Sequence, residues 1–174
     1  MKKIMIMAFA ILLLAACKKE LTSENWIQTE VQSKMNSAKI KVTRPISNNL
    51  QSDPNPNTTS PYGGVLAYGT MTHLGNVHAV TYNTSFTPIS PGVFSITSDD
   101  TTYAANGDEL WGRGSIVVHF PTDGSTTATI TGGSIFVGGT GRFVGATGYL
   151  IYENMVYDIV TGHESHSSHG KITY

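Results

Sequence analysis

From residue 63 to the C-terminus, the sequence predicts an all-β domain, arranged as a closed barrel or a sandwich. Short runs of strand-forming residues recur there with turn residues between them, and all 18 glycines of the chain lie in this region. No stretch in it has helical spacing long enough for a β-α-β unit. A closed barrel also removes the exposed sheet edges that promote aggregation. We expect strands near residues 65–72, 77–86, 92–98, 102–105, 110–120, 126–137, 148–153 and 163–174.

The first sixteen residues have the pattern of a secretory signal peptide. Lys2 and Lys3 form a basic start, and the 13 residues from 4 to 16 are all apolar. A membrane-spanning helix needs about 20 residues, so this run is too short to be a stable anchor. The run leads into Leu14-Ala15-Ala16-Cys17, which resembles a bacterial lipobox. An ordinary signal peptide followed by a chance cysteine is the alternative.

The lipobox predicts a lipoprotein of the bacterial cell envelope, attached to the membrane, with the outer membrane as the expected one. Cleavage would leave Cys17, the only cysteine in the chain, as the first residue, with acyl chains on its sulfur. Each buried CH₂ group contributes about 0.8 kcal/mol to membrane binding, so several acyl chains hold firmly. A single cysteine also excludes a disulfide framework and a cysteine-based metal site.

Residues 17–62 are expected to be a tether between the lipid and the barrel domain of residues 63–174. Between Lys18 and Tyr62 there are six basic and four acidic residues, a net charge of +2. From Gly63 onward there are three basic and eight acidic residues, a net charge of −5. This acidic balance argues against nucleic-acid binding, because phosphate contacts require clustered Lys and Arg.

Three elements are expected within the tether. Apolar residues at helical spacing predict a short helix over residues 22–36. Alternating residues predict an edge strand over 38–43. Three prolines in residues 47–61 predict a flexible connection. A plain spacer is the alternative for the whole segment.

The glycine-rich stretch of residues 132–153 predicts two neighbouring strands joined by a tight corner. Glycines at this density indicate backbone positions with φ > 0 or close approach of chains. Phe143 and Val144 lie inside the corner and are expected to turn back into the core.

The corner Gly139-Thr-Gly-Arg-Phe-Val-Gly-Ala-Thr-Gly148 resembles the GTGxFxxAxG corner of dirigent-like and allene-oxide-cyclase-like β-barrels. Thr72-His73-Leu74-Gly75 and Ala104-Ala105-Asn106-Gly107-Asp108 fit bacterial secreted members of that group. The resemblance covers residues 63–174. It implies an eight-stranded antiparallel barrel, often trimeric in the plant relatives. No catalytic residue of the cyclases matches a position of this chain, so the resemblance implies no particular activity.

Four residues are candidates for a ligand pocket. In the run 77–86, strand alternation puts His78 and Tyr82 on one face, which we expect to point inward. In the run 110–120, Trp111 and Arg113 lie on the face opposite the core-forming Leu110. An apolar cavity with a few polar groups is the usual form of a small-molecule site. A barrel interior filled by side chains is the alternative.

His163, His166 and His169 invite comparison with a zinc or copper site. In an extended strand, His163 and His169 would lie about 20 Å apart on one face and His166 would point the other way. A polar strand without metal is therefore the expectation. No carboxylate pair has the spacing of a catalytic dyad, and neither a Gly-x-Ser-x-Gly elbow nor a phosphate-binding loop is present.

The sequence thus predicts an envelope lipoprotein with a β-barrel module that binds a small apolar ligand or a partner, without a cofactor. An isomerase or cyclase resembling allene oxide cyclase is one alternative, because such enzymes need little beyond a shaped cavity. A structural homo-oligomer is the other.

Overall fold

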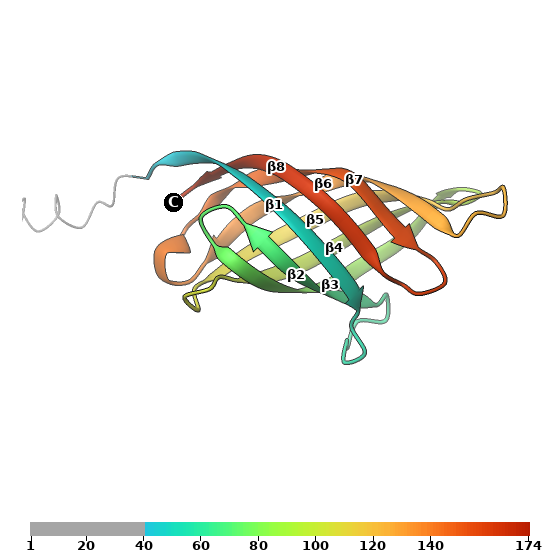
Figure 1. The fold of residues 1–174 in the computed structure, drawn as a ribbon, viewed down its shortest axis with the longest axis horizontal. Helices are drawn as coiled ribbons and strands as arrows, with labels where there is room; N and C mark the ends of the chain where they lie inside the picture. Colours follow the sequence, from blue (N-terminus) through green and yellow to red (C-terminus); the bar gives the residue numbers. More distant parts are fainter. Residues whose placement is uncertain (1–40) are drawn as a thin grey trace, which may run out of the picture. The chain divides into compact units, whose positions relative to one another are not determined.

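The computed structural model describes residues 41–174, which form a closed antiparallel barrel of eight strands in sequence order (Figure 1). The signal peptide, Cys17 and the expected helix over residues 22–36 lie outside the described residues. No helix within residues 41–174 is long and apolar enough to cross a membrane. The strands are β1 (Thr43–Pro54), β2 (Gly64–Met71), β3 (Gly75–Ser90), β4 (Val93–Tyr103), β5 (Glu109–His119), β6 (Thr127–Gly139), β7 (Thr147–Asp158) and β8 (Glu164–Thr173).

β1 closes the barrel, because it pairs with β2 on one side and with β8 on the other. The barrel therefore begins at Thr43 rather than at Gly63, and most of the expected flexible connection over 47–61 is a strand. Of the expected edge strand over 38–43, only Thr43 belongs to β1; residues 41 and 42 precede it, and the rest lies outside the described residues.

The alternation of β1 is hidden in the sequence because its inward face is half polar. Its buried residues are Ile46, Asn48, Leu50 and Ser52. Two polar residues on the core face remove the hydrophobic period of two that identifies a strand.

β4 is one continuous strand, whereas the sequence predicts two runs with Asp99-Asp100 as a turn between them. Aspartate is a poor strand former, which favours the turn on propensity alone. In the barrel, Asp99 faces outward, where its Oδ1 lies 3.2 Å from Nε of Arg113 on β5. Asp100 lines the lumen. Tertiary partners on both faces override the local preference.

The corner between β6 and β7 closes one end of the barrel with a 3₁₀ turn, η1 (Gly141–Phe143). Phe143 is 0% exposed, and its ring meets the ring of Tyr174 edge-on, with 5.1 Å between centroids. Gly141 has a φ of 53°, and a Cβ there would collide with the carboxylate of Asp108. The predicted corner and the burial of Phe143 are confirmed. The expected burial of Val144 is wrong: it follows the turn as its C-cap and is 68% exposed.

A bulge in β7 brings a second side chain to the lumen. Ile130 pairs with Met155 and Gly133 pairs with Ile151. Two residues of β6 therefore lie opposite three residues of β7, so β7 carries one extra residue. Asn154 in this stretch has a φ of 51°. The bulge changes the inward positions from even to odd numbers. As a result, both Tyr152 and Met155 line the lumen.

Two apolar clusters fill parts of the barrel. The first surrounds the corner and includes Ile46, Leu74, Leu110, Phe136, Phe143, Leu150 and Ile172. The second lies on β4 to β7 and consists of Ile96, Val118, Ala128, Ile130 and Met155. On β6 and β7 the residues between the two clusters include Ser134 and Tyr152, so a belt of polar side chains separates the clusters.

Candidate functional site: the barrel lumen

The lumen holds a cavity of about 350 Å³, lined by residues of all eight strands. Most of its wall is apolar, and residues of the two clusters line it on either side of the polar belt. Sites for small molecules span roughly 300–1,000 Å³ and combine apolar walls with a few polar groups. The cavity is therefore of the size and character of a site for a compact ligand.

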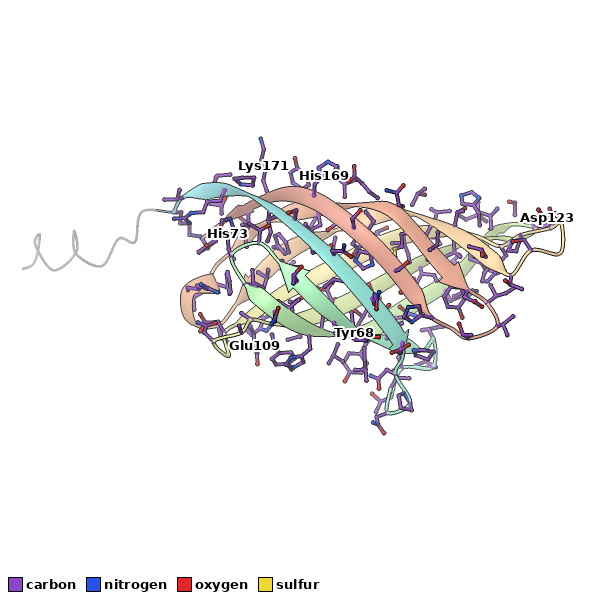
Figure 2. All side chains as sticks on the ribbon, in the orientation of Figure 1. Tyr68, His73, Glu109, Asp123, His169 and Lys171 are labelled. Atoms are coloured by element: carbon purple, nitrogen blue, oxygen red, sulfur yellow. The ribbon has the colours of Figure 1, made fainter. Side chains whose placement is uncertain are left out.

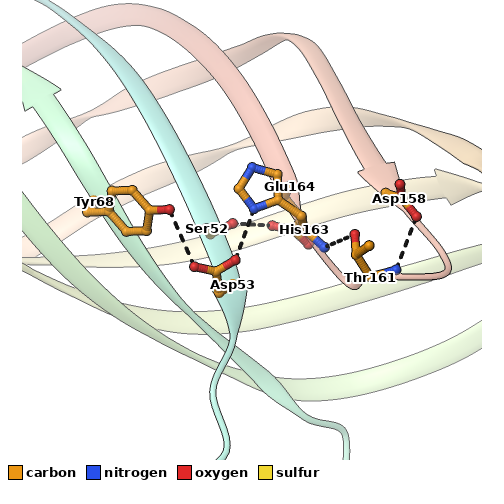
Figure 3. Close-up of polar contacts among 7 residues, drawn as sticks. All are labelled: Ser52, Asp53, Tyr68, Asp158, Thr161, His163 and Glu164. Atoms are coloured by element: carbon orange, nitrogen blue, oxygen red, sulfur yellow. Dashed lines mark hydrogen bonds and ion pairs between the residues drawn. The ribbon is translucent and has the colours of Figure 1, made fainter.

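The cavity opens at the end opposite the corner. Tyr62, in the loop after β1, and Phe86, on β3, line it and are 48% and 40% exposed, so the cavity reaches solvent there. The rim is held by Asp53, whose Oδ1 lies 3.0 Å from Nδ1 of His163 and whose Oδ2 accepts a 3.4 Å hydrogen bond from the hydroxyl of Tyr68 (Figure 3). These contacts join β1 to β2 and to the start of β8. We call this end the mouth.

Asp100 of β4 places a carboxyl group in the polar belt. Ser134 of β6 donates a hydrogen bond from Oγ to Oδ2 of Asp100 at 3.3 Å. Asp100 lines the cavity and is half-buried. Burial raises the pKa of Asp100 to about 6, although the Ser134 hydrogen bond opposes the shift; the charge of Asp99 raises it further. Asp100 therefore changes charge close to neutral pH.

Two glycines on β5 leave the room that this part of the belt occupies. Gly112 pairs with Asp100, and a Cβ at Gly112 would collide with the Asp100 carboxylate. Gly114 pairs with Ser98 in the same way, and a Cβ there would meet the Ser98 hydroxyl. Because these two positions of β5 have no side chain, the side chains of Asp100 and Ser98 on β4 can lie directly above them.

Tyr152 of β7 adds a hydroxyl group near the Asp100–Ser134 pair. Burial raises the pKa of Tyr152, and the charges of Asp100 and Glu164 raise it further, while an interaction with Ser134 opposes the shift. The phenol therefore stays protonated and can donate a hydrogen bond into the cavity.

Glu164 and His166 are the residues of β8 that belong to the polar belt. Ser52 of β1 donates a 2.9 Å hydrogen bond to Oε2 of Glu164 (Figure 3). Burial raises the pKa of Glu164 against the effect of that hydrogen bond. Burial also lowers the pKa of His166 to about 4, so its imidazole is neutral at neutral pH.

Three buried polar atoms in this wall have no hydrogen-bond partner among residues 41–174: Oδ1 of Asn48, Nδ1 of His166 and Oγ of Ser168. Asn48 pairs directly with Ser168, and His166 is the next residue of β8 on the same face. Asn48 and His166 line the cavity. Unsatisfied buried polar groups are rare and each costs about 1–3 kcal/mol, so their grouping in one wall indicates a place where something else supplies the partner.

The four pocket residues expected from the sequence lie on the outer face of the barrel instead. His78 is exposed and stacks on Tyr103, with 4.5 Å between ring centroids. Tyr82 is 41% and Trp111 40% exposed, and Arg113 pairs with Asp99 on the outside. The inward face of β3 carries Val77 and Ala79, so the expected orientation of 77–86 is wrong at His78 and Tyr82; further along, Phe86 does line the cavity.

The two faces of β3 have similar hydrophobicity, which is why alternation alone does not choose between them. Figure 2 shows outward-pointing side chains on β8 as well: those of His169 and Lys171 point away from the barrel. The outer face of this barrel thus carries aromatic and charged groups that resemble pocket residues when only the sequence is considered.

Three of the belt residues had a signal in the sequence. Glu164, His166 and Ser168 share one face of the last strand, and strand alternation correctly separates His166 from His169. His169 pairs on the outside with Glu153, its Nδ1 lying 3.1 Å from Oε1. Within the described part of the chain, no group of three or more His, Cys, Asp or Glu side chains is placed to hold a metal ion. Asp100, Ser134 and Tyr152 had no such signal, because they lie on strands whose pairing and bulges set the orientation.

The fold and the cavity place this chain in the class of closed antiparallel β-barrels with a hollow, open-ended lumen. In comparisons with protein-family models and with curated proteins, no family model and no curated protein matches the chain.

Proposed function

We propose that this protein is a membrane-anchored lipoprotein of the bacterial cell envelope whose barrel binds a small amphipathic ligand in its lumen. The observation that carries the proposal is a cavity of about 350 Å³, open at one end, with a mostly apolar wall, a polar belt and unpartnered polar atoms of Asn48 and His166. A ligand that fills the cavity and meets these atoms removes both the void and the unsatisfied groups.

The lipobox and the topology support the membrane part of the proposal. Leu14-Ala15-Ala16-Cys17 provides the acylation signal. β1 begins at the end closed by the corner, because its C-terminal residue Pro54 lines the mouth. The described chain therefore enters the barrel at the end opposite the mouth.

We also propose that the barrel is a member of the dirigent-like and allene-oxide-cyclase-like group. Eight antiparallel strands in sequence order support this, as does a glycine-framed corner that buries Phe143. No catalytic residue of the cyclases matches a position of this chain, so the resemblance to the group supports a fold and no particular reaction.

Filling the lumen should abolish ligand binding. Ala67 on β2 lines the cavity, and Ala67→Phe places a ring there. Thr70→Phe adds the same ring on the exposed face of the same strand and serves as the matched control. We expect native mass spectrometry of protein purified from its own host to show a bound small molecule in wild type and Thr70→Phe, and only apo protein in Ala67→Phe.

A neutral lipophilic dye, N-phenyl-1-naphthylamine, should follow the same order. We expect enhanced dye fluorescence with wild type and Thr70→Phe and its loss in Ala67→Phe. Apo protein in all three samples, together with no dye binding to wild type, would exclude the lumen as a binding site.

An isomerase or cyclase is the second candidate, and the environment of Asp100 favours it. A general base works best with a pKa near the working pH, and burial brings the pKa of Asp100 to about 6 beside the protonated hydroxyl of Tyr152. A buried acid and a phenol facing one cavity could move a proton between two atoms of a bound molecule. Conversion of an added allene oxide to a cyclised product above the uncatalysed rate, lost in Asp100→Asn, would establish this activity.

A further inference from the structure

We propose that the lumen selects a cationic amphiphile, meaning a small primary or secondary amine on an apolar body, with the ammonium group in the polar belt. The inference rests on the proposed ligand-binding function and names the chemical class of its ligand. It is carried by the charges, the hydrogen-bonding groups and the apolar surface of the cavity.

The charges of the cavity have one sign. Asp100 and Glu164 both line it, and among residues 41–174 no Lys or Arg belongs to its lining. The nearest arginine to Asp100 along the sheet, Arg113, lies on the outer face and is paired with Asp99. Buried carboxylates are normally paired with a cation, so the lumen has two anionic groups whose natural partner is a positive charge from outside the chain.

The two unpartnered atoms whose residues line the cavity can both accept a hydrogen bond. Oδ1 of Asn48 is an acceptor, and Asn48 is only 8% exposed. Nδ1 of His166 is an acceptor when the proton of the neutral ring is on Nε2. The carboxylates add further acceptors. An ammonium group has up to three N–H donors and no acceptor, and therefore complements this wall.

The apolar part of such a ligand has a defined place. Between the belt and the mouth, the cavity is lined by Phe86, Ile116, Phe120 and Tyr157. Aromatic faces favour both an apolar body and a nearby cation. An anionic amphiphile would fit the same apolar surface, but its head group would meet two carboxyl groups and no cation.

Binding of an amine should depend on pH through the carboxyl groups. Burial raises the pKa of Asp100 to about 6 and also raises the pKa of Glu164. Asp99 on β4 and Tyr152 on β7 are the titratable groups that interact with Asp100, and Tyr152 and His163 are those that interact with Glu164. The partners of Asp100 on β3 and β5 are Thr81 and Gly112, which do not titrate. Deprotonation of Asp100 adds a negative charge to the lumen, so amine affinity should rise as pH increases through about 6.

Calorimetric titration with three probes of the same shape tests the inference: 2-phenylethylamine, 2-phenylethanol and 3-phenylpropanoate. The protein is the mature acylated chain in detergent micelles, with protein-free micelles as the blank. At pH 7.5 we expect the amine to bind at least about tenfold more tightly than the alcohol, and the acid most weakly. At pH 5 the preference for the amine should shrink.

Variants identify the groups responsible. Asp100→Asn and Glu164→Gln should each reduce the preference for the amine by about tenfold or more and leave alcohol binding nearly unchanged. Glu153→Gln removes an acid on the outer face, where it pairs with His169, and should leave the preference unchanged. Ala67→Phe should abolish binding of all three probes.

The outcomes separate the inference from the function on which it rests. If the alcohol or the acid binds as tightly as the amine, or the preference persists in the Asp100→Asn/Glu164→Gln double variant, the cationic ligand is excluded while lumen binding stands. The same holds if the neutral dye binds and the amine does not. If neither the dye nor any probe binds wild type, both proposals fail.

Discussion

Asp100 and His166 titrate in opposite senses within one lumen. Burial raises the pKa of Asp100 from 3.8 to about 6, so protonated Asp100 favours the folded state. Its contribution to stability is present below pH 3.8 and is lost as pH rises through about 6. Burial lowers the pKa of His166 from 6.5 to about 4, so its contribution is present above pH 6.5 and is lost as pH falls toward 4. These two terms largely cancel between pH 4 and 6.5.

Replacing Asp100 with Asn should expose the pH dependence of stability from His166, which Asp100 offsets in wild type. The variant keeps the shape of the side chain and removes its titration. Relative to wild type, its free energy of unfolding should increase between pH 4 and 6.5, by up to about 3 kcal/mol for a shift of roughly two pKa units. Urea denaturation at a series of pH values measures this difference. Asp99→Asn, on the exposed side of the same strand, should change the curve much less, because burial rather than the charge of Asp99 is the main cause of the Asp100 shift. A curve for Asp100→Asn parallel to wild type would contradict the burial of its carboxyl group.

The belt residues show why the site was harder to predict than the fold. A strand residue points inward or outward according to its parity, and parity changes at every bulge. In β7 the bulge at Asn154 makes both Tyr152 and Met155 inward. The positions of His78 and Tyr82 on β3 were assigned to the wrong face because both faces of that strand are partly apolar. Composition therefore does not identify the lumen residues of this barrel.

At the level of elements, the corner between β6 and β7 was predictable because it is a local structure. Gly139 packs against the carbonyl of Glu109 and against Phe143, where a Cβ would collide. Such close approach requires glycine at specific spacings, and these spacings are visible in the sequence. β1 shows the opposite case: its polar inward residues suit a polar lumen that forms only when the barrel closes.

Phe143→Ala should test the corner as the closure of the barrel. The ring is fully buried beside Tyr174 and under the guanidinium of Arg142, which lies 4.8 Å from its centroid. Truncation leaves a cavity and should lower the free energy of unfolding by about 3–5 kcal/mol. Val144→Ala changes the exposed neighbour and should cost less than about 0.5 kcal/mol. Equal effects of the two substitutions in chemical denaturation would show that the corner does not seal this end.

At the level of the whole molecule, the proposed anchor and the barrel should be separable. Cys17→Ser removes the acylation site and leaves the barrel sequence unchanged. We expect the variant to move from the membrane fraction to the soluble fraction, because no other acyl chain remains to hold it. Its melting temperature, measured on the isolated protein, should match that of wild type. A mature wild-type mass without acyl chains, or a Cys17→Ser protein that stays with membranes, would contradict the lipoprotein proposal.

The sequence by itself determined the features that depend on neighbouring residues. These are the all-β class, most of the turns, the glycine-framed corner with Phe143 buried, and the core face of β5. Each follows from local sterics or from an alternation that one strand carries alone. Only the tertiary structure decided that Thr43–Pro54 completes the barrel, that Asp99 and Asp100 lie within one strand, and which residues face the lumen. The physical reason is that closure gives polar side chains partners from distant strands, and these partners reverse the preferences that each segment has in isolation.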